Sequence, residues 1–533
     1  MSALAGTGRL TRLALRRERA VAPWWILAIV ALAMSVVSYI TRNMGTYEQK
    51  VAYTRLISGD GFLHALGGGT VEPRLEVLAT WRGGGFLYVA CAFAAVMSVV
   101  RHTRREEDAG RGELIGSTAV SRRAPLTAAV LVASGVSVAA GLATAAALIG
   151  LGLEPVGSLA YGAAVSAAGW VFAGVAAVAA QLARAAGAAT AIGLSALAVA
   201  YVMRYAGDAT GQQWLKALSP IGWSHLVRPY QDERWWMLGV PLLAGGVLLA
   251  VAYRLLDRRD LGGGLLPERL GPAQAPRPRG PVGMAWRLHR GLLAAWAAGV
   301  AFFAAAAAGL SPLARDLLAR PSVVVDNIVR TLGMPAGKAL AAYSWYMILI
   351  LAYAIALYPV LMTLRLRAEE RSGRAEAVQA TPLSRLRWAA GHLAVAGLGT
   401  AGLLAVGGLV FGTLFALLVG DLATDVPRFV AGALGAVPAA WCVGALCVLA
   451  YGLLPRASAA ICWAVWSLTA VLGQVVAPLY GLWGGSPVEP FHYVGNPMTA
   501  AASSGPAAQA ALLGVTAVLL GGGLWALRRR DLG

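Results

Sequence analysis

Runs of about twenty apolar residues recur along this chain of 533 residues and constrain its fold more than any other feature. A run of this length can cross the hydrocarbon core of a bilayer as an α-helix. Six such runs lie at about 23–41, 84–100, 124–150, 158–182, 186–206 and 235–253, and six more at about 291–310, 343–364, 388–419, 429–454, 457–477 and 508–527. The sequence therefore predicts an all-α polytopic membrane protein with twelve crossings.

The two sets of runs are separated by LGGGLLPERLGPAQAPRPRGPVG, a segment rich in Gly, Pro and Arg whose composition favours an extended linker. Leu and Arg residues are mixed in LTRLALRRER (10–19), as in a helix that lies in the membrane interface, although topogenic charge explains the same pattern equally well. The expected organisation is an N-terminal interfacial segment at 1–22, a first six-helix half at 23–260, a cytoplasmic linker at 261–283 and a second six-helix half at 284–533.

The chain has 44 Lys and Arg residues against 25 Asp and Glu residues, a formal charge of +19. In a soluble protein this excess would indicate nucleic-acid binding. Only 13% of the residues are charged, however, against about a quarter in soluble domains. With both termini in the cytoplasm, nearly all the excess falls in the cytoplasmic loops, as the positive-inside rule requires. We therefore expect a multi-pass protein among membrane lipids, with no nucleic-acid partner. Arg far outnumbers Lys and Ala is abundant, which indicates a bacterial cytoplasmic (inner) membrane.

A segment of the first half recurs in the second. RREEDAGRGELIGSTAVSR (104–122) matches RAEERSGRAEAVQATPLSR (367–385) at nine of nineteen positions without a gap. Ser219-Pro220 also recurs as Ser486-Pro487, and RRDLG ends each half at 258–262 and 529–533. Each half is therefore one copy of a six-helix unit. Because six is an even number, both copies have the same orientation, and the halves form two parallel transmembrane repeats.

The duplicated segment lies in the cytoplasmic loop after the second helix of each half. Glu107 and Arg111, like Glu370 and Arg374, have the i,i+4 spacing that favours an ion pair on a helix, so each loop is expected to contain a short stiff helix. Gly110 and Gly373 fall on the same turn, where a glycine lets another backbone approach closely. One such loop could be only a solvated helical cap, but its duplication favours docking to a cytoplasmic partner.

The pattern E-E-x-x-G-R-x-E followed by S-R, at 106–122 and again at 369–385, resembles the loop between the second and third helices of ABC-2 type exporter permeases. LSPIGWSHLVRPY (218–230), WRLHRG (286–291) and the two RRDLG ends support this resemblance. The fused twelve-helix form resembles permeases that export polyketide antibiotics (tetronasin-like). The resemblance spans almost the whole chain and implies an ABC-2 (type V exporter-like) architecture.

In that family each loop is a coupling element seated in a groove of an ATP-binding subunit. The resemblance assigns coupling to the ATPase to Glu106, Glu107, Gly110, Arg111, Glu113 and Arg122, and to Glu369, Glu370, Gly373, Arg374, Glu376 and Arg385. GMPAGK (333–338) lacks the first Gly and the final Ser or Thr of a phosphate-binding loop, so the chain has no nucleotide site. The expected chain is a permease subunit without a cofactor or enzymatic activity of its own. ATP and Mg would be bound by a cytoplasmic ABC subunit, as a homodimer.

The same resemblance places the translocation path along the second and fifth helices of each half. The aromatic, Met and Gln side chains there suit a hydrophobic small-molecule cargo but are also ordinary membrane packing. They are Phe86, Phe93, Met97, Tyr201, Met203, Trp345, Tyr353, Tyr358, Trp463, Trp466 and Gln474. His392 has no acidic neighbour within two turns and is expected to be hydrogen-bonded inside the bundle. No His, Cys or carboxylate spacing forms a metal or catalytic motif.

The expected function is therefore that of an ATP-driven exporter permease for hydrophobic natural products, drugs or lipids. Two alternatives stay open. An ion-coupled twelve-helix secondary transporter would need charged residues embedded in the membrane, and few ionisable residues lie in the apolar runs. A membrane scaffold that recruits a cytoplasmic protein would use the duplicated loops without transport.

Overall fold

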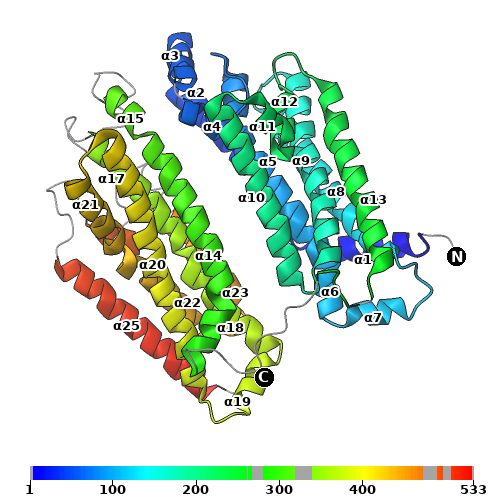
Figure 1. Ribbon diagram of the computed structural model, residues 1–533, viewed down its shortest axis with the longest axis vertical. Coiled ribbons are helices and arrows are strands. Elements are labelled where there is room, and N and C mark those ends of the chain that lie inside the picture. Colours follow the sequence, from blue (N-terminus) through cyan, green and yellow to red (C-terminus); the bar gives the residue numbers. More distant parts are fainter. Residues whose placement is uncertain are drawn as a thin grey trace. The chain divides into compact units, whose positions relative to one another are not determined.

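The computed structural model describes residues 4–59, 61–260, 262–266, 280–318, 339–471, 489–495 and 506–530. The chain divides into two compact units, Met1–Leu270 and Gly271–Gly533, and the helices of each unit form a bundle (Figure 1).

The first unit contains α1 (Thr7–Glu18), α2 (Ala22–Asn43), α3 (Tyr47–Gly59), α4 (Gly61–Gly67), α5 (Leu75–His102), α6 (Arg104–Asp108), α7 (Arg111–Gly116), α8 (Ala124–Gly150), α9 (Pro155–Leu182), α10 (Ala186–Thr210), α11 (Gln213–Leu218), α12 (Pro220–Leu226), η1 (Trp235–Leu238) and α13 (Gly239–Arg258). Its centre is formed by α5 and α9, whose most apolar stretches are 72% and 78% buried. These two helices are therefore shielded by the others, whereas α2, α10 and α13 keep most of their apolar surface on the outside of the unit.

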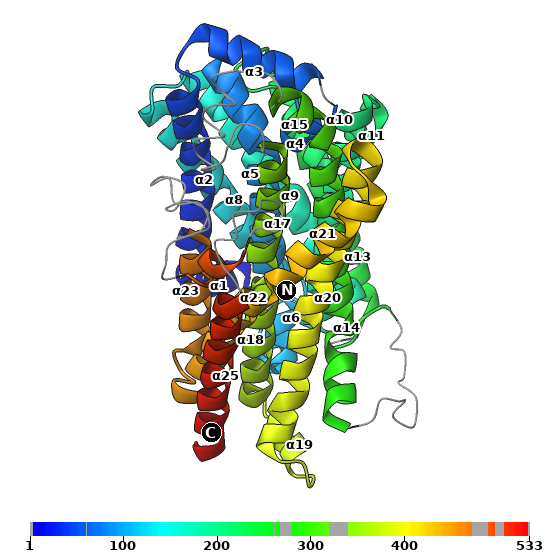
Figure 2. The ribbon, with the colours of Figure 1, turned by 90° about the vertical axis from the view of Figure 1, so that its left-hand side faces the viewer.

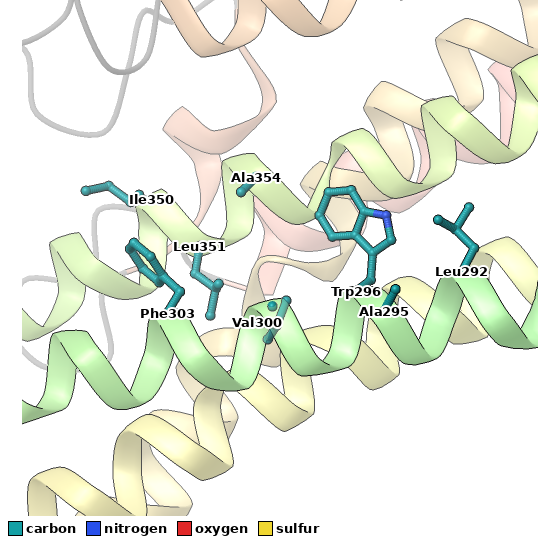
Figure 3. Close-up of a pocket in the computed structure, with 9 residues that line it drawn as sticks. Leu292, Ala295, Trp296, Val300, Phe303, Ile350, Leu351 and Ala354 are labelled. Atoms are coloured by element: carbon teal, nitrogen blue, oxygen red, sulfur yellow. The ribbon is translucent and has the colours of Figure 1, made fainter. Parts of the chain in front are cut away.

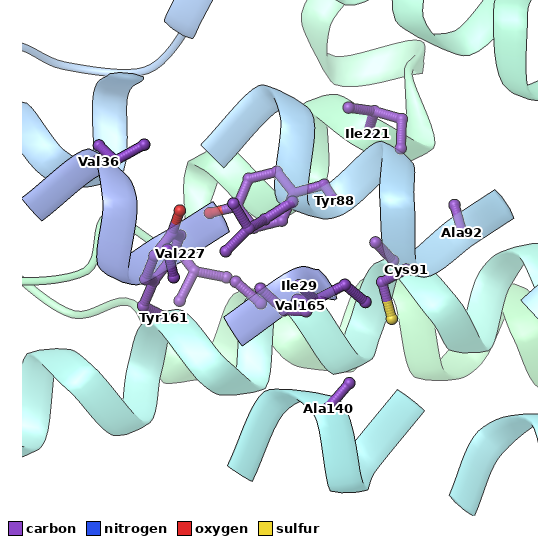
Figure 4. Packing of buried hydrophobic residues seen from close by; sticks show 14 of the residues in the cluster. Ile29, Val36, Tyr88, Cys91, Ala92, Ala140, Tyr161, Val165, Ile221 and Val227 are labelled. Carbon is purple, nitrogen blue, oxygen red and sulfur yellow. The ribbon is translucent and has the colours of Figure 1, made fainter. Parts of the chain in front are cut away.

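The core of the first unit is built from aromatic and branched side chains of α2, α5 and α9 (Figure 4). Tyr88 and Tyr161 meet edge to face with ring centroids 6.0 Å apart. The helix α9 begins at Pro155, and the carboxylate of Glu154 accepts hydrogen bonds from the backbone N–H groups of Val156 and Gly157, which caps the helix.

The helices α8 and α9 cross at Gly141 and Gly162. A Cβ atom on either glycine would overlap the main-chain carbonyl oxygen of the other. The two backbones therefore touch directly, which is a common way for helices to associate in membranes, where close van der Waals packing replaces the hydrophobic effect. The second unit has a similar crossing at Gly408, where a Cβ atom would meet the carbonyl oxygen of Phe429 on α21.

The second unit contains α14 (Gly280–Gly309), α15 (Ser311–Leu318), α17 (Ala339–Ile355), α18 (Leu357–Arg371), α19 (Arg374–Gln379), α20 (Arg385–Val419), α21 (Leu422–Gly435), α22 (Val437–Leu453), α23 (Ser458–Val471), η4 (Pro490–Tyr493) and α25 (Pro506–Arg529). Within it, α25 lies alongside α22, and α19 lies at the end of the bundle where α18 and α25 finish (Figure 2).

Eleven helices among the described residues are long and apolar enough to cross a membrane. The prediction of an all-helical polytopic protein is confirmed. The predicted count of twelve differs because the run at 457–477 appears as α23, whose described part is shorter, and 472–477 lie outside the described residues.

The ends of the expected linker differ from the prediction. Of 261–283, residues 280–283 already belong to α14, because Pro281 is tolerated in the first turn of a helix. The N-terminal segment does form a separate helix, α1, whereas WRLHRG (286–291) is part of the continuous α14.

Candidate functional site

In each unit a glycine interrupts the helical structure of the duplicated loop, and a short helix follows it. In the first unit Gly110 separates α6 from α7, and in the second Gly373 separates α18 from α19. Their φ angles are 72° and 71°, in the left-handed region that favours glycine. A Cβ atom on either residue would meet no other atom within 4 Å. Each glycine is therefore required by its left-handed turn, and no other described backbone lies against it. Close approach of a partner's backbone stays a prediction.

This turn also breaks the predicted i,i+4 ion pairs, because their members no longer share one helix. Arg111 instead pairs with Glu106, with Nε–Oε2 and Nη2–Oε1 distances of 2.7 and 2.9 Å. The hydrogen bonds to this carboxylate raise the pKa of Arg111, so its guanidinium stays charged. In the second unit Arg374 donates to the hydroxyl of Ser372 over 3.1 Å.

The second glutamate of each loop is bound to the arginine that follows the last helix of its own unit. Arg259 Nη2 lies 2.6 Å from Glu107 Oε1, and Arg530 Nη2 lies 2.6 Å from Glu370 Oε2. The hydroxyl of Tyr451 donates a further hydrogen bond to Glu370. Because these carboxylates are at most 19% exposed, their ion pairs hold the loops more firmly than surface pairs would.

The arginine that ends each loop reaches the same anchor. Arg122 donates to the main-chain carbonyl of Arg259, and Arg385 donates to that of Arg530. Arg259 in the first unit and Arg530 in the second thus each bind both the second glutamate and the last arginine of the loop. The loop is tied at two points to the end of α13 in the first unit and of α25 in the second.

The arginine that begins each duplicated segment makes a third connection. Arg104 is fully buried and donates to the carbonyl oxygens of Ala180 and, over 2.8 Å, of Gly263. Arg367 donates to the carbonyl oxygens of Pro455 and Arg456, both over 3.0 Å. These acceptors lie at or just beyond the ends of α9 and α22, apart from Gly263, which follows α13. Each loop therefore joins the ends of three long helices.

The tips of the loops remain accessible. On α7, Arg111 is exposed and the side chain of Leu114 is 71% exposed. On α19, Arg374 and Glu376 are exposed. The side chain of Glu113 lies outside what the structure describes. The predicted coupling residues thus divide into anchors and an exposed tip, and contact with a partner stays a prediction.

In the first unit the loop also holds α1. Arg17 lies 2.6 Å from Glu106, and the carboxylate of Glu18 lies 2.7 Å from His102 and 3.1 Å from Arg101. Burial alone would raise the pKa of Glu18, but the hydrogen bond with His102 and the charge of Arg101 outweigh it, and the pKa is lowered.

The second unit has a buried histidine pair near its loop. His289 Nε2 and His392 Nδ1 lie 2.8 Å apart, and His392 Nε2 lies 3.6 Å from the carboxylate of Glu369. The prediction that His392 is hydrogen-bonded inside the bundle is confirmed. Its acidic neighbour comes from α18, another helix, which is why inspection of the adjacent turns did not reveal it.

The residues predicted to line a translocation path differ in how far they are buried. Trp345, Tyr353 and Tyr358 are buried in the core of the second unit, where the hydroxyl of Tyr353 donates to Glu489. Those with exposed or half-buried side chains are Phe86, Phe93, Met97, Tyr201, Met203, Trp463 and Trp466. Gln474 lies outside the described residues. For the exposed and half-buried group the lining of a path stays a prediction.

The second unit has an apolar groove of about 340 Å³ between α14 and α17 (Figure 3). Its lining residues are Leu292, Ala295, Trp296, Gly299, Val300, Phe303, Ile350, Leu351 and Ala354. None of them is among the predicted path residues. Aliphatic side chains in an apolar run carry no signal that distinguishes a groove from a surface covered by lipid.

Comparison with known proteins accounts for the duplicated architecture. A family model described as "Multidrug efflux system permease Rv1217c, C-terminal domain" matches residues 9–255 and again residues 279–528. The chain belongs to this family. One member, the multidrug efflux system permease protein Rv1217c of Mycobacterium tuberculosis (strain ATCC 25618 / H37Rv), is 36% identical over 538 residues, which cover 99% of this chain and 96% of that protein. The two matches confirm the predicted internal repeat.

Four anchors of the loops in this Rv1217c-family permease are missing from the predicted site: Arg104, Arg259, Arg367 and Arg530. The sequence does contain a signal for them. Arg104 and Arg367 occupy the first aligned position of the duplicated segment, and Arg259 and Arg530 lie in the RRDLG ends. The sequence alone does not show that segments 76 to 160 residues apart meet at these anchors.

Proposed function

We propose that this chain is the transmembrane permease subunit of an ATP-driven exporter of the ABC-2 type. Its cargo would be a hydrophobic natural product, a drug or a lipid, moved out of the cell. Membership in a family of efflux permeases supports export, and the relative of 36% identity is named for multidrug efflux. The observation that carries the ATP-driven part is the duplicated loop, anchored in the same way in both units.

The anchors of each loop suit the transmission of movement from the loop to the long helices. A loop that only capped a helix would need no contacts with the ends of two others. Here Glu107 binds Arg259 beyond α13, and Arg104 binds carbonyl oxygens at the end of α9 and beyond α13. A force on α7 would therefore reach three long helices through short, largely buried polar contacts. The same argument applies to Glu370 and Arg367 in the second unit.

The exposed tips suit docking. Leu114 presents a large apolar side chain beside the charged Arg111 on α7, and α19 presents Arg374 and Glu376. Apolar anchors with neighbouring arginines are typical of protein interfaces. The proposed partner is a cytoplasmic ABC subunit that binds ATP and Mg. It would be a homodimer, because the chain offers one loop per unit, and the permease would lie in a bacterial cytoplasmic membrane with both termini in the cytoplasm.

The experiment that tests this proposal separates the tip from the anchors. The chain would be co-expressed with ABC ATP-binding subunits from the same organism and purified through a tag on the permease. Leu114→Glu places a charge on the tip of α7, and Leu218→Glu makes the same change at an exposed residue of α11, at the other end of the unit. We expect the first variant, and not the second, to lose the copurified ATPase and the cargo-stimulated ATP hydrolysis.

Other outcomes identify the alternatives. Export by the chain alone in a proton gradient, without any bound ATPase, would replace the proposal with a secondary transporter. An ATPase that binds but never drives export in vesicles would favour the scaffold. Equal copurification with Leu114→Glu and with the wild type would remove α7 from the docking surface.

A further inference from the structure

A buried cluster of charges lies in the first unit, at the end opposite the duplicated loop. The helix α10 begins beside the loop, where Asp108 accepts a hydrogen bond from the N–H of Ala186 over 2.9 Å. Its last turns carry Arg204 and Asp208, and α11 adds Lys216. Their exposed fractions are only 0%, 8% and 6%. Asp208 lies 2.8 Å from Lys216 and 3.4 Å from Arg204.

The cluster has one carboxylate for two cations. Arg204 uses Nη1 to donate to the carbonyl of Ala65, and its guanidinium lies over the ring of Tyr201, 4.7 Å from the centroid. Its Nε and Nη2 atoms are buried without a hydrogen-bond partner among the described residues. Buried donors of this kind, and a buried excess charge above all, are unfavourable unless something compensates them.

A histidine next to the cluster does not supply that compensation. His225 is only 6% exposed, and its Nε2 has no hydrogen-bond partner within the described part of the chain. Burial, followed by the charges of Arg204, Lys216 and His64, lowers the pKa of His225 well below its ordinary value. The ring is therefore neutral near pH 7 and can donate or accept one hydrogen bond at Nε2.

A cavity of about 540 Å³ adjoins these groups. Its lining includes Asp208, Lys216 and His225 together with Arg228, Arg234 and the carboxylate of Glu72, which accepts a hydrogen bond from Gln231. Asp232 pairs with both Arg228 and Arg234, so these groups together with Arg204 keep an excess of one positive charge. The backbone of Gly68 and Gly69, with φ angles of 77° and 87°, passes directly beside the cluster. A Cβ atom on Gly68 would meet Arg204, Asp208 and His225, so the chain carries no side chain at this point.

We infer that this cavity binds one anionic oxygen group, a phosphate or a carboxylate. A single negative charge would balance the second cation of the cluster, and its oxygen atoms would accept hydrogen bonds from Lys216 or His225. A purely structural role, in which Asp208 ties α10 to α11, explains the pair with Lys216. This structural role does not explain the excess positive charge of the cluster or the cavity beside it. The inference does not depend on the proposed efflux function, because it concerns binding alone.

The anion could be a lipid headgroup or a soluble ion, and the experiment distinguishes them. The purified full chain in uncharged maltoside micelles would be titrated calorimetrically with inorganic phosphate and, separately, with dihexanoylphosphatidylglycerol. We expect millimolar or tighter binding of at least one probe. Tighter binding of the lipid identifies a headgroup site, and tighter binding of phosphate identifies a site for a soluble anion.

The variants give opposite predictions. Lys216→Gln removes the excess charge and should weaken binding about tenfold or more, as expected for the loss of a charge-assisted hydrogen bond. Asp208→Asn keeps the shape and increases the excess charge, so it should tighten binding. The matched control is Arg55→Gln, which removes an exposed charge of α3 outside the cavity lining.

Three results would overturn the inference. They are the absence of binding of both probes to the wild type, a loss with Arg55→Gln as large as with Lys216→Gln, and weaker binding by Asp208→Asn. If Lys216→Gln fails to fold, Asp208→Asn still decides, because its expected effect is a gain.

Discussion

The carboxylate of Glu370 and the guanidinium of Arg530 lie 2.6 Å apart although 160 residues separate them in the sequence. Glu107 and Arg259 make the same contact in the first unit, at the same distance. The two ion pairs join a loop to the end of the unit that contains it. They recur because the two units are copies of one repeated domain.

The first prediction concerns this ion pair. Glu370→Gln should lower the thermal-unfolding midpoint, since removal of one partner of a partly buried ion pair costs about 1–3 kcal/mol. It should also reduce cargo-stimulated ATP hydrolysis while the ATPase still copurifies, because the exposed tip is unchanged. Glu48→Gln makes the same chemical change at an exposed position of α3, outside both duplicated loops, and as the control should behave like the wild type.

Charge reversal provides a second check on the same pair. Glu370→Arg alone should be worse than Glu370→Gln, because it brings two guanidinium groups together. Addition of Arg530→Glu should restore part of the midpoint. Failure of the double variant to improve on Glu370→Arg would count against the ion pair as the anchor.

The second prediction concerns the turn in the loop. Gly373→Ala should destabilise the second loop by about 1–2 kcal/mol, because a side chain in the left-handed region clashes with its own backbone. Gly373→Asn should cost less, since Asn tolerates this conformation. The readout is hydrogen exchange of α19 compared with α20. Gly402→Ala, at an exposed and spacious position of α20, should leave exchange unchanged or slower. Equal exchange in Gly373→Ala and the wild type would contradict the argument.

The third prediction concerns the crossing of α8 and α9. Gly162→Ala should force the helices apart, because its Cβ atom would overlap the carbonyl oxygen of Gly141. Overpacking of this kind costs about 1–3 kcal/mol. The thermal midpoint in detergent should fall, whereas Gly135→Ala should not lower it, since nothing lies within 4 Å of a Cβ atom there. Similar midpoints for the two variants would show that the crossing can relax.

The fourth prediction concerns pH. Burial raises the pKa of Glu489 to about 7, although the hydrogen bond from Tyr353 opposes it. The unfolded chain releases this proton near the ordinary value of 4.5, so the folded protein binds more protons between the two values. The stability contributed by the protonated carboxyl is therefore fully present below about pH 4.5 and is lost as the pH rises through about 7.

The measurement is the thermal midpoint at about pH 5 and about pH 8, in the wild type and in Glu489→Gln. The amide cannot titrate, so this variant should show a smaller fall between the two conditions. Glu376→Gln, which changes an exposed carboxylate, should keep the full dependence of the wild type. An unchanged fall in Glu489→Gln would assign the dependence to other groups.

The long helices could be predicted from the sequence because each needs only a local signal. The apolar run at 124–150 begins after Arg122 and Arg123 and ends at the turn formed by Gly150 and Gly152, and α8 has these bounds. The run at 388–419 likewise lies within α20, which has 35 residues. The repeat was equally visible, since nine identities in one short segment require no knowledge of the fold.

The site was only partly predictable, because its contacts are not local. Helical spacing predicts an ion pair between Glu107 and Arg111. Because the chain turns at Gly110, Arg111 binds Glu106 instead, and Glu107 binds Arg259. The buried pair of His289 and His392 was missed for the same reason, since its partners come from α14 and α20.

Arg259, which anchors the loop of the first unit, belongs to that same unit. Arg259 donates to the carbonyl of Gly263, and the N–H groups of Leu265 and Leu266 donate to the carbonyls of Gln181 and Leu182. A polypeptide severed just after this point would leave both sets of anchors whole, because each set lies within one of the two units. Their union in one chain has a different benefit, which is stoichiometry. Every molecule carries one loop of each kind, so the homodimeric ATPase proposed above would meet two loops of different sequence.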